Sequence, residues 1–382
     1  MEKAVGGERF EMDRSKFIKA GIIGMGGIGP AHYEALCRVG GVGVTSIAEI
    51  DRERVDACAE KYGIANAYTD YRALIDDREV EVVHIASPNH VHYEQVKAAL
   101  EAGKHVVCEK PLAVNPIQTA ELVSLAKEKK LVNEVNFNHR FFPLVFHARE
   151  MIRRNELGPI TLIRAYALGD FMLSLSVNYP NHWRTKPETV GSSKTMSVYG
   201  GHCLDLIQFV SGLQIKEVFA DLGYVDPTKS GDLEDSINIL LRFDSGTKGA
   251  VTFSEAAPGR KCEVFFEIIG TKASVAWNLA NPNEMWIGYH SQPNRSFYKD
   301  ADLLYPEAKE IAGPPEWQQD GYVDSLKHCF IKIYDYIREE KHLRNIEPDF
   351  ATFETGHNME LVLQGMMNSA KNERWEKIQY GV

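Results

Sequence analysis

The sequence predicts an α/β half built on a doubly wound parallel sheet, followed by an α+β half built on an open, mainly antiparallel sheet with helices. Short apolar runs alternate with helix-length segments as far as Pro143, a pattern typical of parallel strands joined by right-handed crossovers. Beyond Pro143, β-rich stretches separated by tight turns predominate. The chain has 382 residues, which is long for a single hydrophobic core, so we expect two domains.

The first half is predicted from apolar runs that each precede a helix-length segment. We expect strands at residues 19–23, 44–50, 82–86, 106–108 and 131–137, and helices at 30–39, 91–102, 116–130 and in a segment ending at Tyr62. Residues 1–17 are polar and hold no apolar segment, so we predict a flexible extension rather than a signal peptide. Residues 18–143 are then expected to form a Rossmann dinucleotide-binding domain.

Residues 144–382 are assigned to a second domain, in which β-branched runs end at Gly-containing turns. We expect strands at 160–168, 216–224, 236–243, 247–254, 263–269 and 273–277, hairpin turns at 244–247 and 270–272, and helices at 144–155, 201–210, 322–340 and 352–372. The stretch 280–315 is rich in Pro and Asn and is predicted to be mostly loop.

Composition argues against several classes of function. The formal net charge of −10 disfavours binding to nucleic acid or to an anionic membrane surface. No run approaches the roughly 18 apolar residues of a membrane span. The six cysteines have no metal-binding or disulfide spacing, which fits reduced thiols in the cytoplasm. His90 and His92 have no third ligand at a typical distance, so we predict no metal site.

A glycine-rich turn follows the first predicted strand and opens the first predicted helix. Gly24 would allow the tight turn, Gly26 would let the backbone approach a pyrophosphate, and Gly29 would allow the helix to pack closely on the strand. Gly27 and Ile28 complete the amino end of the helix, whose free N–H groups favour phosphate. Glycine turns also serve plain strand-to-helix connections, so this motif alone leaves a structural role open.

Glu49 ends the second predicted strand, 25 residues after Gly24. A carboxylate there can accept hydrogen bonds from the ribose hydroxyls of NAD and would repel the 2′-phosphate of NADP. Arg52 could soften that repulsion, so NAD is preferred, and a solvated carboxylate at a strand end is the structural alternative.

Further residues are expected at the cofactor site. Ser87 and Pro88 suit a turn beneath the nicotinamide, and Asn89 could cap the helix that follows. The remaining residues expected to line this site are His92, Glu109, Lys110 and Asn138.

Lys110 stands in a Glu-Lys-Pro turn directly after an apolar strand. A lysine at the carboxyl end of a buried strand, beside a dinucleotide crevice, is well placed to touch a reacting oxygen. The pattern therefore predicts nicotinamide-dependent redox chemistry on a hydroxyl or carbonyl, with an ordinary surface lysine as the alternative.

Together these motifs resemble those of the Gfo/Idh/MocA oxidoreductases. The likeness continues through Asn138-His139-Arg140-Phe141, Leu157-Gly158-Pro159-Ile160, Trp183-Arg184 and Gly201-His202-Cys203-Leu204-Asp205, and it covers nearly the whole chain after the extension. It implies a Rossmann domain followed by an open antiparallel sheet, through which such proteins usually form homo-oligomers. Residues 144–382 are therefore expected to bind substrate and to mediate oligomerisation, and the substrates of the family are commonly sugars, inositols and sugar derivatives.

The resemblance implies that Lys110 contacts the reacting oxygen and that His202 accepts its proton. Oxidation of a carbinol needs a base for the hydroxyl proton, and imidazole titrates near neutrality. A cationic lysine can stabilise the developing alkoxide. A core histidine on a helix is the structural alternative for His202.

The chain departs from the family pattern at one position. Many members carry an aspartate four residues before the histidine, where this chain has Val198. Asp205 falls on the same helical face as His202 and could orient it instead, and Tyr199 is another possible donor in the pocket.

A narrower likeness is to the branch that includes levoglucosan dehydrogenase and enzymes that oxidise the C3 hydroxyl of glycosides. It runs through residues 233–236, 254–260 and 281–286 and suggests a pyranoside substrate. Trp183 could stack on an apolar sugar face, and the side chains that could bind sugar hydroxyls are Asn136, Arg140, Asn181 and Arg184. Each of them could equally serve packing or a salt bridge.

Three functional hypotheses follow. The leading one is an NAD-dependent dehydrogenase that oxidises a ring hydroxyl of a sugar, at C3 of a glycoside. The second is an enzyme that retains NAD through a whole cycle, either exchanging redox equivalents between two sugars or cleaving a glycoside by oxidation and elimination. The third is a non-catalytic NAD-binding sensor, which the apolar Val198 would favour.

Overall fold

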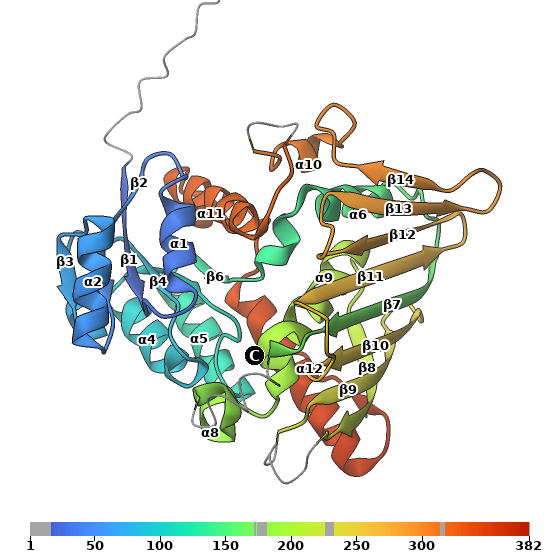
Figure 1. The fold of residues 1–382 in the computed structure, drawn as a ribbon, viewed down its shortest axis with the longest axis horizontal. Helices are drawn as coiled ribbons and strands as arrows, with labels where there is room; N and C mark the ends of the chain where they lie inside the picture. The colour runs from blue at the N-terminus through green and yellow to red at the C-terminus, as the bar shows by residue number, and fades with distance from the viewer. Residues whose placement is uncertain (1–16, 172, 174–181, 226–232, 314–317, 382) are drawn as a thin grey trace, which may run out of the picture.

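The computed structural model describes residues 17–171, 173, 182–225, 233–313 and 318–381. Its strands form two separate sheets, which Figure 1 shows side by side with helices packed between and around them. Nearly all of the predicted amino-terminal extension lies outside the described residues.

The first sheet has six parallel strands in the order β3-β2-β1-β4-β5-β6. The strands are β1 (Ile18–Ile23), β2 (Val42–Ala48), β3 (Asn66–Tyr68), β4 (Val82–Ile85), β5 (His105–Cys108) and β6 (Asn133–Val135). The helices between them are α1 (Gly29–Leu36), α2 (Arg52–Tyr62), α3 (Tyr71–Asp76), α4 (Asn89–Glu101) and α5 (Pro116–Lys129). The strand order reverses between β1 and β4, which is where a doubly wound sheet opens a binding crevice at its carboxyl edge.

The second sheet has nine strands in the order β14-β13-β12-β11-β7-β10-β9-β8-β15, antiparallel throughout except for the parallel pair β7 and β10. The strands are β7 (Ile160–Leu168), β8 (Ile215–Gly223), β9 (Ser236–Phe243), β10 (Lys248–Ser254), β11 (Glu263–Gly270), β12 (Ala273–Asn278), β13 (Glu284–Tyr289), β14 (Arg295–Tyr298) and β15 (Glu376–Lys377). Along β9 and β10, buried side chains alternate with more exposed ones, so one face of the sheet is covered and the other is open.

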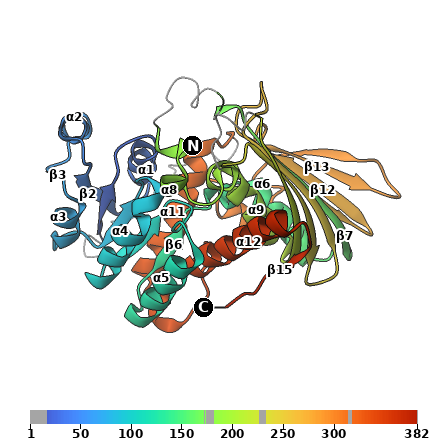
Figure 2. The same cartoon turned by 90° about the horizontal axis from the view of Figure 1, so that it is seen from below.

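The remaining helices cover one face of this sheet and return to the first. They are α6 (Pro143–Arg153), α8 (Pro187–Val190), α9 (Gly201–Ser211), α10 (Pro306–Lys309), α11 (Tyr322–Arg338) and α12 (Phe353–Asn372), with shorter helical turns at Asn138–Phe141, Trp183–Thr185, Met196–Gly200 and Lys341–Arg344. Helix α9 packs on β7 and β11, and α12 packs on β8. Helix α11 lies against α1, and α12 lies against α5 as well as β8, so α12 joins the two sheets (Figure 2).

Most predicted elements are confirmed to within a few residues, including β7 and β9, whose bounds match the prediction. The loop predicted over residues 280–315 is wrong, because it contains β13, β14 and α10. The short elements β3 and α3 were not predicted. None of the described helices combines the length and the apolar character that a membrane crossing requires.

Candidate active site

A cleft of about 1210 Å³ opens at the carboxyl edge of the first sheet and extends toward the second half of the chain. Its walls come from the turns after β1, β2, β4 and β5 and, on the other side, from segments near Trp183, Tyr199 and Cys262. Small-ligand sites usually measure roughly 300–1,000 Å³, so this cleft has room for a dinucleotide and a second small molecule.

The glycine turn between β1 and α1 is shaped by close backbone contacts. Gly24 has a φ of +93°, and a Cβ on it would lie 2.7 Å from the backbone of Ala86. A Cβ on Gly29 would lie 2.0 Å from the carbonyl oxygen of Gly24. Gly29 therefore serves close packing, as predicted, and does not line the cleft. At Gly26 and Gly27 a Cβ would meet nothing within 4 Å, so their backbone borders open space that can receive a phosphate.

Glu49 is anchored at the wall of the cleft just after β2. Its Oε2 accepts a hydrogen bond from the Met25 backbone N–H at 3.0 Å and lies 3.6 Å from the guanidinium of Arg54. The side chain is 9% exposed, so the carboxylate is held in one place at the wall of the cleft. Arg52, which the sequence placed beside Glu49, instead pairs with Asp56 at 3.3 Å, so Arg54 is the neighbouring cation.

The turn after β4 is tied to the Glu-Lys-Pro turn by His92. One ring nitrogen of His92 lies 2.8 Å from the carbonyl oxygen of Ser87, and the other lies 2.7 Å from that of Pro111. Burial lowers the pKa of His92, although both backbone contacts act in the opposite direction. Ser87 donates its hydroxyl proton to Gln95 at 2.5 Å. His92 thus braces the floor of the cleft.

The predicted capping role of Asn89 is wrong. Pro88 occupies the N-cap position of α4, and no side chain caps this helix. The amide of Asn89 donates instead to the carbonyl oxygen of Val190 at 3.0 Å and to the hydroxyl of Ser197 at 2.9 Å. Asn89 therefore links α4 to the segment that carries the second half of the site.

Lys110 projects from the turn after β5 into the cleft. Its ammonium donates hydrogen bonds to the carbonyl oxygens of Ser197 at 2.8 Å and Val198 at 2.6 Å. Burial lowers the pKa of Lys110 to about 8; nearby Arg184 acts in the same direction, while the neighbouring carboxylate of Glu109 opposes the shift. Two carbonyls fix two of the three N–H directions, so one position on Nζ is left for a third partner.

His202 lies at the start of α9 and faces the same cleft. Its imidazole stacks on that of His139, with ring centroids 3.9 Å apart and planes inclined by 21°. The Nδ1 atom of each ring is buried and has no hydrogen-bond partner among the described residues. Burial, together with nearby His139 and Lys110, holds the pKa of His202 well below its usual value, so the ring is neutral near pH 7.

The predicted role of Asp205 in orienting His202 is wrong. Both oxygens of Asp205 accept hydrogen bonds from Arg140, at 2.7 and 2.5 Å, in a buried bidentate pair. Arg140 was predicted to bind a substrate hydroxyl, but it is committed to this pair, and neither residue lines the cleft. The Arg140–Asp205 pair instead fixes the short helical turn at Asn138–Phe141 to α9.

Two other predicted residues also lie behind the cleft wall. Asn136 donates its amide proton to Glu109 at 2.7 Å, and Asn138 donates to the hydroxyl of Ser325 at 2.8 Å. Both are fully buried and support the site from outside it. Glu109, Lys110 and His202 do line the cleft, as predicted.

The side of the cleft opposite the first sheet carries Trp183, Arg184 and Tyr199. The guanidinium of Arg184 lies over the ring of Trp183, 4.2 Å from its centroid, so one aromatic face is already occupied. Burial, with Cys262 and Glu255 nearby, raises the pKa of Tyr199 well above its usual value, so its hydroxyl stays protonated and can donate. Asn181 lies outside the described residues.

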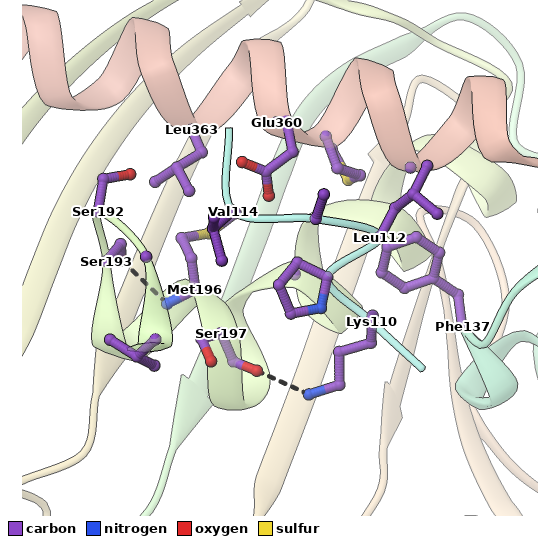
Figure 3. Close-up of a pocket in the computed structure, with 17 residues that line it drawn as sticks. Lys110, Leu112, Val114, Phe137, Ser192, Ser193, Met196, Ser197, Glu360 and Leu363 are labelled. Atoms are coloured by element: carbon purple, nitrogen blue, oxygen red, sulfur yellow. Dashed lines mark hydrogen bonds between the residues drawn. The ribbon is translucent and has the colours of Figure 1, made fainter. Parts of the chain in front are cut away.

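A second, much smaller cavity of about 30 Å³ lies behind Lys110 (Figure 3). Glu360 of α12 points its carboxyl group into it, toward Val114 and Met196, and no hydrogen bond from a described residue reaches that group. Burial raises the pKa of Glu360 to about 8. This cavity can hold a water molecule but not a substrate.

Several residues of the cleft were not predicted. Cys262 precedes β11, Tyr322 begins α11, and His139 lies within a quoted motif without an assigned role. Each reaches the cleft only through tertiary packing, for which no local sequence pattern gives a signal. Among the described residues, no group of three or more His, Cys, Asp or Glu side chains could hold a metal ion.

Both halves of the chain match models of known protein families. Residues 18–137 match the oxidoreductase family with an NAD-binding Rossmann fold, and residues 145–276 match the Gfo/Idh/MocA C-terminal domain. The chain belongs to the Gfo/Idh/MocA oxidoreductases. The cofactor is NAD, and the chain is an NAD-dependent oxidoreductase of the sugar dehydrogenase class.

Several members of this family are similar to the chain in sequence or in structure. Levoglucosan dehydrogenase of Pseudarthrobacter phenanthrenivorans is 28% identical over 354 residues, covering 86% of this chain and 88% of that protein. A structure of levoglucosan dehydrogenase in complex with NADH and levoglucosan superimposes with a TM-score of 0.87 at 28% identity, covering 95% of this chain and 100% of that one. Myo-inositol 2-dehydrogenase of Thermotoga maritima is 28% identical over 63% of this chain and 69% of its own length.

The residues present fit NAD. The open backbone at Gly26 and Gly27 would hold the pyrophosphate, the anchored carboxylate of Glu49 would hold the ribose hydroxyls, and the turn after β4 would lie beneath the nicotinamide. Lys110 and His202 line the same cleft.

Proposed function

We propose that this protein oxidises a ring hydroxyl of a sugar or glycoside, at C3 of a pyranoside, with Lys110 and His202 as the catalytic pair. The observation that carries the proposal is the cleft itself, in which a lysine held by two carbonyls and a neutral imidazole meet at the end of a dinucleotide site. Relatives solved with levoglucosan or L-sorbose support a sugar substrate.

In this proposal Lys110 accepts the hydroxyl proton. A neutral amine spends its two hydrogens on the carbonyls of Ser197 and Val198, and its lone pair then faces the remaining direction, where a substrate hydroxyl can donate. A pKa near the working pH is what a general base requires. When bound, NAD+ supplies the acceptor for the hydride that leaves the carbinol carbon.

His202 takes a different part from the one expected from the sequence. Without a carboxylate on Nδ1, its imidazolium form would be buried and unpaired, so the ring is a poor proton acceptor. We propose that the neutral ring hydrogen-bonds the reacting hydroxyl and orients it toward Lys110. The proton thus moves from the hydroxyl to Lys110 Nζ as the carbonyl forms.

The proposal is tested with a substrate panel and a matched set of deoxy sugars. NADH formation is measured with methyl glucosides, free hexoses and inositols, and then with the 2-, 3- and 4-deoxy forms of the best glycoside. We expect turnover on glycosides that is lost only with the 3-deoxy form. Turnover on inositols alone, or loss with another deoxy form, would contradict C3 oxidation.

The same assay distinguishes an enzyme that retains NAD through its cycle from one that releases NADH. If purified protein already absorbs as NADH, and one sugar is oxidised only while another is reduced, the cofactor is not exchanged. Net NADH formation that matches the sugar oxidised supports the ordinary dehydrogenase.

We also propose that the open face of the second sheet forms a homo-oligomer interface. The strand register puts Leu240, Arg164 and Trp286 in one row across that face. Leu240 is 50% exposed and Trp286 is 37% exposed, which is unusual for large apolar side chains on a regular sheet.

A further inference from the structure

Four buried side chains form a continuous hydrogen-bond chain that ends beside Lys110. The hydroxyl of Tyr334 lies 2.9 Å from His84 Nε2, His84 Nδ1 lies 3.1 Å from His32 Nδ1, and His32 Nε2 lies 3.0 Å from Glu109 Oε1. The four groups come from α11, β4, α1 and the turn after β5. Of these four residues only Glu109 lines the cleft, so the hydrogen-bond chain runs from α11 to the turn that carries Lys110.

The packing around the two imidazoles fixes their positions. Phe330 of α11 contacts both rings, with centroids 5.1 Å from His32 and 4.8 Å from His84. Phe330 and Tyr334 lie four residues apart and so share one face of α11. The side chains of both histidines and of Tyr334 are shielded from solvent.

Proton placement along the chain follows from its chemistry. A neutral imidazole has one donor and one acceptor nitrogen. If Tyr334 donates to His84 Nε2, then His84 must carry its proton on Nδ1 and donate to His32 Nδ1. His32 must then carry its proton on Nε2 and donate to Glu109. In this direction each of the three links has one donor and one acceptor, and the network ends on a carboxylate. In the opposite direction His32 Nε2 would accept from the Asn136 amide at 3.3 Å, and the Tyr334 hydroxyl proton would have no acceptor among these groups.

Glu109 is able to end this network as a carboxylate. Its Oε1 also accepts from the amide of Asn136 at 2.7 Å, so this one oxygen faces two donors. Burial alone would raise the pKa of Glu109, but His32, Lys110 and Asn136 outweigh it and lower the pKa below the usual value. Burial, with His32 nearby, holds the pKa of His84 well below its usual range, so that ring is neutral.

We propose that Tyr334 is a positioning residue for catalysis: its hydroxyl sets the tautomers of His84 and His32, which in turn hold Glu109 as an anion beside Lys110. This inference rests on the proposed function. Without the hydroxyl, His84 Nε2 has no donor, and the His84 tautomer is free to reverse. Reversal turns the lone pair of His32 Nε2 toward Glu109 and removes a hydrogen bond that holds the carboxylate.

The consequence for Lys110 has a definite sign. The charged and titratable groups around its ammonium are Glu109, Arg184, Cys262, Glu255, His139 and His202. Glu109 is the first of these in favouring the ammonium form. A loosened or protonated Glu109 therefore makes the ammonium less stable, and the midpoint of the Lys110 titration falls.

The first experiment reads the tautomers directly and needs no turnover. The NAD-bound protein is labelled with 15N-histidine, and the two ring nitrogens of His32 and His84 are identified by NMR. We expect the proton of His84 on Nδ1 and that of His32 on Nε2. A proton on His84 Nε2, or an imidazolium at either position, would overturn the chain even if sugar oxidation proceeds normally.

The second experiment tests the positioning role with Tyr334→Phe. Tyr336→Phe is the matched control, because Tyr336 is on the same helix and donates to the Ile346 carbonyl away from this chain. The Lys110 titration is followed by NMR of labelled lysine in the NAD-bound protein, alongside the pH dependence of kcat/KM. We expect both midpoints to fall by about 0.5 to 1 pH unit in Tyr334→Phe alone.

The outcomes separate this inference from the proposed function. An unchanged Lys110 midpoint in Tyr334→Phe, with folding intact by thermal unfolding, overturns the positioning role. Absence of turnover on every sugar overturns the proposed function. The histidine tautomers and the Lys110 midpoint still test the positioning role of Tyr334 in that case.

Discussion

The chemistry of the site is set by the groups that contact Lys110 and His202. Lys110 keeps its place because two carbonyls from the turn before α9 accept hydrogen bonds from it, and burial brings its pKa into the working range. His202 keeps a neutral ring because burial lowers its pKa and no described residue pairs with its Nδ1 atom. Val198 stands where many members of the family carry an aspartate, and in the proposed mechanism the amine of Lys110, not the imidazole of His202, accepts the proton.

At the same scale, the sequence identified the groups whose role depends on local context. Gly24, Gly26, Glu49 and Lys110 sit at strand ends, and the carboxyl ends of parallel strands meet at one edge, so their convergence could be predicted. The partners of Arg140 and Asp205 could not, because a residue's position on a helix face does not say which distant charge will pair with it.

Glu360 provides a stability prediction that is independent of turnover. Its folded pKa is raised to about 8, so the folded state keeps a proton that the unfolded chain releases near pH 4.5, and wild-type stability declines as pH rises between these values. Glu360→Gln removes this decline. The difference in free energy of unfolding between the variant and wild type should shift in favour of the variant by roughly 2 to 4 kcal/mol from about pH 5 to pH 8.

The measurement is chemical unfolding at both pH values. Glu354→Gln, on an exposed part of the same helix, is the control and should show little change with pH. A constant difference between Glu360→Gln and wild type across the range would show that Glu360 is not protonated in the folded state.

At the scale of elements, periodicity was a reliable guide wherever one face is buried. The strands β7, β9 and β10 alternate buried and exposed side chains, and their predicted bounds agree with the structure. The error at 280–315 arose because Asn-Pro and Gln-Pro-Asn segments were read as loop. These segments are turns that flank β13 and β14. Both strands are short, and in β13 the buried residues Met285 and Ile287 give only a weak periodic pattern.

The β1–α1 turn allows its two glycine roles to be separated. Gly29→Ala would force a Cβ to 2.0 Å from Gly24 O, so we expect destabilisation of about 1 to 3 kcal/mol together with weaker NADH binding. Gly26→Ala meets no protein atom and should leave stability within about 0.5 kcal/mol while weakening NADH binding at least about tenfold.

Thermal unfolding and NADH titration of the two variants make the comparison. Equal loss of stability in both would mean that Gly26 serves the fold. Unchanged NADH affinity in Gly26→Ala would mean that the pyrophosphate does not pass along this backbone.

On the scale of the whole molecule, the cleft depends on contacts that span the chain. His139 stacks on His202 from another segment, and Tyr334 reaches His84 across 250 positions. Such pairs leave no local pattern, which is why His139 and Tyr322 were missed although the family and both sheets were predicted. The last two long helices, α11 and α12, return to pack against α1 and α5 of the first half.

The proposed homo-oligomer interface on the open face of the second sheet leads to a prediction about subunit assembly. Leu240→Lys combined with Trp286→Lys places charge in the exposed row and should convert the oligomer to a smaller species without loss of secondary structure. Leu303→Lys, at a 62% exposed position outside the sheet, is the control. Mass by light scattering decides, and a wild-type protein that is already monomeric, or a double variant of unchanged mass, would contradict the interface.

The pH dependence of kcat/KM for glycoside oxidation tests the central claim most directly, with wild type and Lys110→Met compared under saturating NAD. For wild type we predict a rise with pH through a single ionisation near about 8, as Lys110 loses its proton, followed by a plateau. Lys110→Met should bind NADH normally but fall at least about 100-fold on the plateau and lose that ionisation. A wild-type profile that is flat from about pH 6 to 9, or a variant that retains most of its activity, would show that Lys110 is not the proton acceptor.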